Sequence, residues 1–218
     1  LWRVLALCCA IGAGALSLQF GQLSTAVGFT LGLAAFVVAM LAPRLAIITT
    51  TAGLTAWMLI APFATPLLIA ASPRLIEALP FSSAARVMIW DYTSARIAEQ
   101  PWIGHGLDAG RTVNDLVAIR GELLSGIPVH PHSASLQIWY ELGLVGAALA
   151  AAALAYGGWR LAAALQHDRL AAATAAAVLA MFGFMANIGW SIWQEWWMAT
   201  LLLAAALVTA LAARAARA

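Results

Sequence analysis

The sequence predicts an all-α membrane protein, a polytopic bundle of about six transmembrane helices with one large loop outside the lipid. Of its 218 residues, 64% are hydrophobic and only 9% are charged. A soluble domain carries about 25% charged residues, so lipid rather than water must surround most of this chain. The polar residues concentrate between Ser72 and His132, which hold five of the eleven arginines, six of the nine acidic residues and three of the four histidines.

Three apolar runs precede this loop and three follow it, each near the roughly 20 residues that a transmembrane helix needs. The expected spans are Leu1 to Phe20, Ala26 to Leu41, Leu45 to Ala71, Ser133 to Leu161, Leu170 to Trp190 and Met198 to Ala213. Pro62 and Pro66 lie late in the third run, and they predict a kink or an early end of that helix.

The chain is therefore expected to have three parts in one integral membrane domain. Residues 1–71 form three transmembrane helices, residues 72–132 form the outer loop, and residues 133–218 form three more transmembrane helices. The chain begins at Leu1, and no cleavage site follows the first apolar run, so we expect a span there and a longer chain around it.

Arginines at the ends of the spans predict the orientation. With six spans, one side of the membrane receives all the arginines of the short connections and termini, namely Arg3, Arg44, Arg160, Arg169, Arg214 and Arg217. The positive-inside rule places that side in the cytoplasm, and therefore places the Ser72–His132 loop outside. A cluster of tryptophans then falls at the outer interface, formed by Trp190, Trp193, Trp196 and Trp197.

One helix is expected inside the loop. Ser82 and Ser83 can cap its start, residues 84–99 mix apolar and polar positions, and Pro101 ends it. The stripe along one face comprises Arg86, Trp90, Thr93 and Ile97. This helix is too polar to span, so we expect it to lie along the outer membrane surface or to pack across the bundle.

A tight turn is expected next, over Pro101-Trp102-Ile103-Gly104-His105-Gly106. Gly104 and Gly106 supply positive φ or a close backbone approach there. Residues 107–131 show no strong periodicity, and their structure is not predicted.

His132 is the first candidate for chemistry because it lies where the loop re-enters the membrane. A histidine titrates near neutral pH and can take a proton from an acceptor hydroxyl, so it can act as a general base. An interfacial histidine that only caps a helix is the alternative. His130 is a less favoured candidate for the same role, and Pro131 separates it from His132.

Arginines of the loop are the candidates for binding a diphosphate, because a guanidinium offers a planar, permanently charged fork. Arg86, in the first turn of the expected helix, is the main candidate, and the lesser ones are Arg74, Arg96, Arg111 and Arg120. Each has the alternative of being a solvated or salt-bridged surface residue. Trp90 follows Arg86 by one helical turn and is a further candidate contact with substrate.

Glu141 and Gln137 lie on one face of the fourth expected span, and both are interpreted as structural hydrogen-bonding residues, with the loop as the suggested partner of Glu141. In a continuous helix, Glu141 falls on the opposite side from His132, so the two should not form a dyad. The sequence holds no phosphate-binding glycine loop, dinucleotide fingerprint, zinc spacing or serine elbow. We therefore expect no metal site, no cofactor and no nucleic-acid partner.

Four short motifs together resemble the O-antigen ligase family, which includes O-antigen polymerases and exopolysaccharide polymerases. The motifs are Arg86-Val87-Met88-Ile89-Trp90, the turn 101–106, His130-Pro131-His132-Ser133-Ala134-Ser135-Leu136-Gln137 and Glu141-Leu142-Gly143-Leu144-Val145-Gly146. The resemblance covers roughly residues 22–161.

The resemblance implies a glycosyltransferase with a GT-C-like fold in the bacterial inner membrane, whose main loop is periplasmic. Such enzymes move a glycan from undecaprenyl diphosphate to a hydroxyl of lipid A core, of another glycan or of another acceptor, with inversion and without a metal. By motif, Arg86 corresponds to the diphosphate-binding arginine and His132 to the histidine that assists the acceptor.

Two departures from the family pattern stand out. Ser133 replaces the asparagine that often follows the histidine, and it can still form hydrogen bonds. Ser24-Thr25 matches a stretch that often contains an arginine, so one expected diphosphate contact is missing. Arg74, Arg111 or Arg120 could compensate, or the chain could be a divergent inactive member.

Other classes of function remain open from the residues alone. A transporter or flippase of polyprenyl-linked glycans needs polar residues along several spans, and these spans have few. A non-catalytic membrane scaffold is a third possibility. Ligase and polymerase share the same motifs, so the sequence does not separate them.

Overall fold

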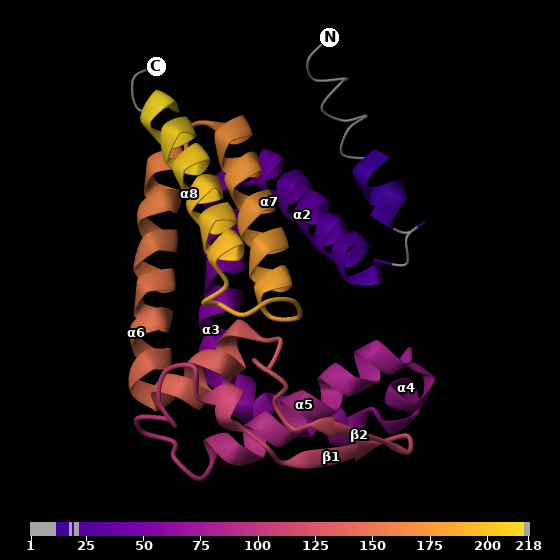
Figure 1. The fold of residues 1–218 in the computed structure, drawn as a ribbon. Coiled ribbons are helices and arrows are strands. Elements are labelled where there is room, and N and C mark those ends of the chain that lie inside the picture. The colour runs from indigo at the N-terminus through magenta and orange to yellow at the C-terminus, as the bar shows by residue number, and fades with distance from the viewer. Residues whose placement is uncertain (1–11, 18, 20–21, 216–218) are drawn as a thin grey trace. The chain divides into compact units, whose positions relative to one another are not determined.

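The computed structural model describes residues 12–17, 19 and 22–215, and most of its regular structure is helical (Figure 1). The helices are α2 (Leu23–Leu41), α3 (Pro43–Ala71), α4 (Pro73–Ala78), α5 (Phe81–Ile97), the short 3-10 helix η1 (Ala109–Thr112), α6 (Ala134–Leu165), α7 (Arg169–Ala186) and α8 (Glu195–Ala215). The strands β1 (Leu116–Ile119) and β2 (Glu122–Ser125) pair antiparallel. The predicted all-α class is confirmed, and the four-residue strands of the hairpin are an addition to it.

Five of the described helices, α2, α3, α6, α7 and α8, are long and apolar enough to cross a membrane. The chain is therefore a multi-pass membrane protein. The first expected span, Leu1 to Phe20, lies mostly outside the described residues. Two predicted bounds in the C-terminal part are wrong: α7 ends at Ala186 rather than Trp190, and α8 begins at Glu195 rather than Met198. The Glu195 carboxylate is favourable in the first turn of α8 because of the helix dipole.

The chain folds into two compact units. The first comprises the chain up to Thr50, Trp159–Met185 and the chain from Leu203 on. Its core is built largely from alanines of α7, which lie against aliphatic residues such as Ile47 and Leu165. Small residues allow helices to approach closely in a membrane.

The second unit comprises Thr51–Gly158 and Ala186–Leu202, and it contains the whole Ser72–His132 loop. Its core joins helix α5, the segment after the hairpin and the start of α6. The buried members are Ala61, Ile97, Ile127, Leu136, Trp139, Tyr140 and Ala147. Trp90 is partly buried against this core.

Helix α3 runs through both of its prolines to Ala71, so the predicted early end is wrong. A proline at position 62 removes the N–H that would bond the carbonyl of residue 58. The Trp139 indole donates to the Met58 carbonyl at 2.7 Å. A neighbouring helix therefore supplies the missing donor, which is how prolines are tolerated in transmembrane helices.

Helix α5 begins one residue earlier than its predicted cap, at Phe81, and the cap prediction is wrong. Ser82 and Ser83 lie inside the first turn, and no side chain caps the helix. Pro80 precedes the helix in an extended conformation, and its carbonyl accepts the N–H groups of Ser83 and Ala84. Proline rarely sits inside a helix, so the boundary falls directly after it.

The hairpin is anchored to α4 and α5. The Tyr92 hydroxyl of α5 donates to the Asp115 carboxylate, and burial together with this bond raises the pKa of Tyr92 to about 12. Arg120, in the hairpin turn, donates to the Ile76 and Glu77 carbonyls of α4 at 3.0 and 2.8 Å. These contacts order residues 107–131, for which the sequence shows no periodicity.

Helix α6 consists of two helical segments that meet in a kink at Gly143, where φ is 61° and ψ is −159°. Across the kink, the N–H groups of Leu144 and Val145 donate to the carbonyls of Pro101 and Trp102 instead of to their own helix. In return, the Tyr140 and Glu141 carbonyls accept from the N–H groups of His105 and Gly106 at 2.8 and 3.0 Å. The predicted turn thus replaces the hydrogen bonds that the kink removes.

Candidate functional site

His130 and His132 precede the first turn of α6, and the charges of Arg86 and Arg111 act on them. The rings of His130 and His132 lie 4.3 Å apart, centroid to centroid. The charge of Arg86 acts on His132, and the charge of Arg111 acts on His130, in both cases lowering the pKa of the histidine. Four of the sequence-predicted site residues therefore interact electrostatically, although they span 47 positions of the chain from 86 to 132.

The protonation of His132 is set by a backbone contact. Its Nδ1 lies 2.7 Å from the Gly189 carbonyl oxygen. A carbonyl only accepts, so Nδ1 carries a proton and Nε2 keeps its lone pair in the neutral ring. Burial, and then the nearby Arg86, lower the pKa of His132 although the Gly189 contact opposes the shift. His132 is therefore neutral at pH 7, with a basic nitrogen available.

His130 has the opposite arrangement. Its Nδ1 accepts the backbone N–H of His132 at 3.2 Å, so in the neutral ring the proton is on Nε2. Burial, followed by the charges of His132 and Arg111, lowers the pKa of His130 to about 4. At pH 7 His130 is a neutral donor, while His132 is a neutral acceptor.

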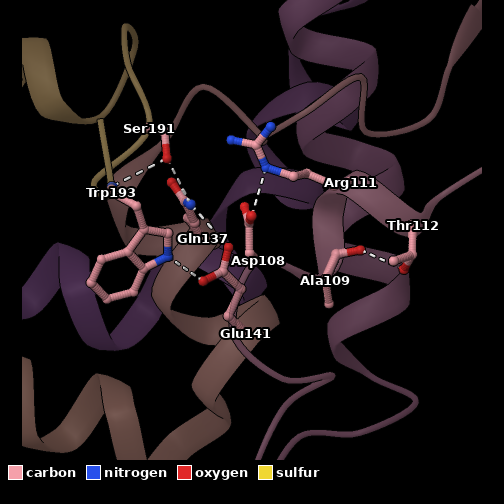
Figure 2. A network of polar contacts seen from close by, with 8 residues as sticks. All are labelled: Asp108, Ala109, Arg111, Thr112, Gln137, Glu141, Ser191 and Trp193. Atoms are coloured by element: carbon pink, nitrogen blue, oxygen red, sulfur yellow. Dashed lines mark hydrogen bonds and ion pairs between the residues drawn. The ribbon is translucent and has the colours of Figure 1, made fainter. Parts of the chain in front are cut away.

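The two arginines differ in their partners. Arg111 pairs with Asp108 at 2.6 Å and stays largely exposed (Figure 2). Arg86 is half-buried on α5, and within the described part of the chain it takes part in neither of the two ion pairs, which join Arg96 to Glu99 and Arg111 to Asp108. A half-buried cation without an acidic partner is suited to binding an anion.

The start of α6 is held by Ser133 and Asn187. The Ser133 hydroxyl accepts the Leu136 N–H, and the Asn187 side-chain oxygen accepts the Ser135 N–H at 3.2 Å. The expectation that Ser133 can form hydrogen bonds in place of an asparagine is confirmed. The N-terminus of α6 adds a positive dipole end to the site.

Gln137 and Glu141 are both buried and hydrogen-bonded to each other at 2.9 Å (Figure 2). Gln137 also donates to the Ser191 hydroxyl and accepts the Ile192 N–H. The Trp193 indole donates to the second oxygen of Glu141. Both side chains therefore bind residues 191–193 rather than the histidines or the loop. The helix is not continuous from His132, whose φ is 54°, so the helical spacing is not what separates Glu141 from it.

The chain belongs to the O-antigen ligase family. The family model described as "O-Antigen ligase" matches residues 4–151. Proteins named "Putative polysaccharide ligase" in Rickettsia bellii and Rickettsia typhi are 30% and 28% identical, over 123 and 183 residues respectively. These alignments cover 55% and 81% of this chain but only 30% and 44% of the relatives. A Rickettsia prowazekii relative is 31% identical over 54% of the chain and 29% of its own length.

This O-antigen ligase family member thus spans less than half the length of the curated relatives it matches. No solved structure matches the chain.

Three of the predicted substrate contacts of this family member lie elsewhere in the unit or have other partners. Arg120 is bonded to carbonyls of α4. Arg74 is exposed on the same helix. Trp90 is partly buried, and its indole nitrogen has no hydrogen-bond partner among the described residues. Of the arginines that could compensate for the one missing at Ser24-Thr25, only Arg111 acts on the histidines.

Gly104 and Gly106 both adopt positive φ, at 71° and 100°, so this prediction is confirmed. A Cβ at Gly104 would collide with the backbone of Glu141 and Leu142, whereas a Cβ at Gly106 would meet open space. Gly104 is therefore needed for two reasons: its positive φ forms the turn, and its lack of a side chain lets the turn approach the backbone of α6.

The sequence did not indicate the role of the segment 187–193. This segment forms hydrogen bonds with His132, with the start of α6 and with the Gln137–Glu141 pair. Its polar residues Asn187 and Ser191 interrupt an otherwise apolar stretch, and this is the signal that could have found it. The contact with His132 uses only the Gly189 carbonyl, which no side-chain pattern reveals. Among the described residues, no three His, Cys, Asp or Glu side chains lie close enough to hold a metal ion.

Proposed function

We propose that the protein transfers a glycan from undecaprenyl diphosphate to an acceptor hydroxyl, as an O-antigen ligase or a surface-polysaccharide polymerase. The observation that supports this most is the meeting of a neutral histidine base with two arginine charges in front of a helix N-terminus. A base and an anion-binding group are the two parts that such a transfer needs.

His132 is the proposed general base. The acceptor hydroxyl attacks the anomeric carbon, and its proton moves to Nε2 of His132. The Gly189 carbonyl holds the opposite nitrogen protonated, which keeps Nε2 ready to accept and stabilises the imidazolium that forms. A positioned base of this kind contributes roughly 10²- to 10⁴-fold in rate.

Arg86 is the proposed main contact with the diphosphate. As the glycosidic C–O bond breaks, its electron pair stays on the diphosphate oxygen, and a guanidinium stabilises that charge. Arg111 and the Nε2–H of His130 add a second cation and a neutral donor on the same side. Attack from the face opposite to the leaving diphosphate inverts the anomeric centre, and no step uses a metal ion.

Trp90, Arg74 and Arg120 are proposed as outer contacts of the substrate. Trp90 lies one turn after Arg86 on α5, and its buried indole nitrogen has no partner. Arg74 is exposed on α4, and Arg120 binds the carbonyls of Ile76 and Glu77 in the same helix. A long glycan can reach these positions while its diphosphate is held at Arg86.

We also propose that the protein lies in the bacterial inner membrane with the loop on the periplasmic side. The support is the distribution of arginines in the short connections of the sequence. The six-span order assigns Arg44, Arg160, Arg169 and Arg214 to one side of the membrane and the loop to the other. Undecaprenyl diphosphate is a lipid, so its diphosphate is presented at the membrane surface where α6 begins.

The test is complementation of a deletion strain with full-length protein carrying Arg86→Ala or His132→Ala. We expect surface glycan to fall at least 100-fold for each variant, while Arg169→Ala and His167→Ala, exposed residues of the α6–α7 connection, leave it unchanged. Surface glycan at the wild-type level in both site variants would refute the catalytic assignment. Loss of glycan flipping in these variants would instead favour a transporter.

Free polymer on the lipid carrier in the deletion strain would identify a ligase. Single repeat units on the carrier would identify a polymerase. The two outcomes differ in the acceptor that the missing enzyme would have used. Both are compatible with the same base and the same diphosphate contacts.

A further inference from the structure

The turn over residues 101–107 exposes three large apolar side chains although it belongs to the polar loop. Trp102, Ile103 and Leu107 are 69%, 73% and 66% exposed. The remaining side chain of the turn that could cover them, His105, points inward instead: it stacks on Tyr140 and bonds the Arg96 carbonyl at 2.9 Å. A group of neighbouring exposed apolar residues of this size marks a site that contacts another protein or a membrane.

The backbone of the turn is fixed directly to a membrane-spanning helix. The Pro101 and Trp102 carbonyls accept the N–H groups of Leu144 and Val145 at 2.8 and 3.2 Å. Close packing supports these bonds, since a Cβ at Gly143 would collide with the backbone of Trp102 and Ile103. The turn therefore cannot move away from α6 without breaking them.

The exposed apolar surface of the turn is continuous with the lipid-facing surface of α6. Val145, bonded to Trp102, is 55% exposed, and Leu149, one helical turn further on the same face, is 67% exposed. Helix α6 qualifies as a membrane span, so these two residues face acyl chains. The surface of Trp102 and Ile103 extends the same lipid-facing strip beyond the kink.

The length of α6 indicates how deep in the bilayer the 101–107 turn lies. From Leu144 to Arg160, which marks the other end of the span, the helix is about 24 Å long at 1.5 Å per residue. The Arg160 side chain can extend further to the head groups, so this segment covers most of a hydrocarbon core of about 30 Å. The kink at Gly143 therefore falls at one face of the bilayer. Tryptophan favours this level, because its ring is apolar and its N–H can reach the polar head groups.

We propose that the 101–107 turn is a membrane anchor, which inserts Trp102, Ile103 and Leu107 at the boundary between the head groups and acyl chains of the bilayer. The anchor fixes two elements at that level. It holds α6 at the kink through four backbone bonds, and it holds the end of α5 through His105 and the Arg96 carbonyl. The helix with Arg86 is thus kept at the surface where a lipid-linked substrate presents its polar end.

The hairpin offers a matched comparison within the same loop. Leu123 of β2 is 64% exposed and equally apolar, but the described contacts of the hairpin join it to α4 and α5 rather than to a span. Bilayer contact is therefore expected for Ile103 and not for Leu123.

The test is spin labelling of full-length protein in nanodiscs of phosphatidylethanolamine and phosphatidylglycerol. Ile103→Cys and Leu123→Cys are labelled separately in a background without other cysteines. The accessibility of each label to oxygen, which partitions into lipid, is compared with its accessibility to a water-soluble nickel chelate. We expect the oxygen-to-nickel ratio at Ile103 to exceed that at Leu123 at least threefold.

Equal ratios at the two positions, or a label at Ile103 shielded from both probes, would overturn the proposal; the shielded result would indicate a protein partner. Leu107→Cys repeats the measurement if Ile103→Cys does not fold. The accessibility ratio does not depend on transfer activity. Failure of the anchor proposal can therefore be distinguished from failure of the proposed function.

Discussion

His130 and His132 present opposite nitrogens to the site because each has a different backbone partner. The Gly189 carbonyl keeps Nδ1 of His132 protonated, and the His132 N–H occupies Nδ1 of His130. Both rings are kept neutral by burial and by nearby arginine charge. Two histidines in one short motif thus provide one acceptor and one donor rather than two copies of a base.

The pH dependence of transfer should report the neutral form of His132. Its pKa lies below 6.5, owing first to burial and then to the Arg86 charge, and the active form is the deprotonated one. We expect kcat/KM to rise with pH through this lowered pKa and to be level above about pH 7.5, which is one unit above the ordinary histidine pKa. The measurement is the initial rate of glycan transfer in proteoliposomes across this range.

In the same assay, His132→Ala should lower the plateau by roughly 10²- to 10⁴-fold and remove the rise. A rate that continues to increase above pH 7.5 (about one unit above the ordinary histidine pKa) would point to a different base.

At the scale of elements, the kink of α6 and the 101–107 turn form one structure. The kink leaves two donors and two acceptors of the helix without partners, and the turn supplies two of each. Gly143 and Gly104 make the approach possible, because a Cβ on either would enter the opposing backbone. The kink also directs the first part of α6, with His132 before it, away from the line of the span.

Gly104→Ala is expected to destabilise the protein more than Gly106→Ala. Both positions have positive φ, which costs about 1–2 kcal/mol for alanine, but only position 104 adds a clash with the backbone of Glu141. The free energy of unfolding in detergent, measured by denaturant titration, should fall by at least a further ~1 kcal/mol for Gly104→Ala. Equal losses in the two variants would mean that the turn does not pack against the kink.

Trp193→Phe tests the polar network that joins α6 to residues 191–193. The substitution keeps the ring but removes the donor to Glu141, whose side chain is buried. Leaving a buried acceptor without that donor should cost about 1–3 kcal/mol of unfolding free energy. Trp190→Phe is the control, since Trp190 is exposed to the same degree and packs on Trp196 by ring contact.

A double substitution of Trp193→Phe with Glu141→Leu should cost less than the sum of the two single ones, because both remove the same bond. Additive losses would show that the Trp193 indole and the Glu141 carboxylate act independently.

At the scale of the whole molecule, one polar segment, the Ser72–His132 loop, lies between the third and fourth expected spans. The described spans have few charges, while Arg44, Arg160 and Arg169 mark the ends of α3, α6 and α7 away from the loop. This asymmetry predicts the orientation without reference to the site.

Reporter fusions in the full-length protein test the orientation. Alkaline phosphatase inserted at Gly121, in the hairpin turn, should be active, and the same reporter inserted beside His167 should be inactive. A fluorescent protein should show the opposite result at the two positions. The reverse pattern would place the loop in the cytoplasm and would contradict the periplasmic reaction.

The amino-acid sequence by itself determined the membrane class, the order of the spans and the candidate residues Arg86 and His132. These depend on runs of apolar residues, on short motifs and on the distribution of arginine. All three are properties of the linear sequence and can be recognised without the fold. The Gln137–Glu141 contact was also predictable, because a helix places residues four apart on one face.

Only the tertiary structure decided which candidates meet. Arg111 joins the histidines whereas Arg120 is bonded to α4, and nothing in their sequence surroundings distinguishes them. The tautomer of His132 and the continuation of α3 past Pro62 both depend on backbone carbonyls, at Gly189 and Met58, bonded from distant segments. Every residue has such a carbonyl, so its partner is a property of the fold and leaves no mark on the sequence.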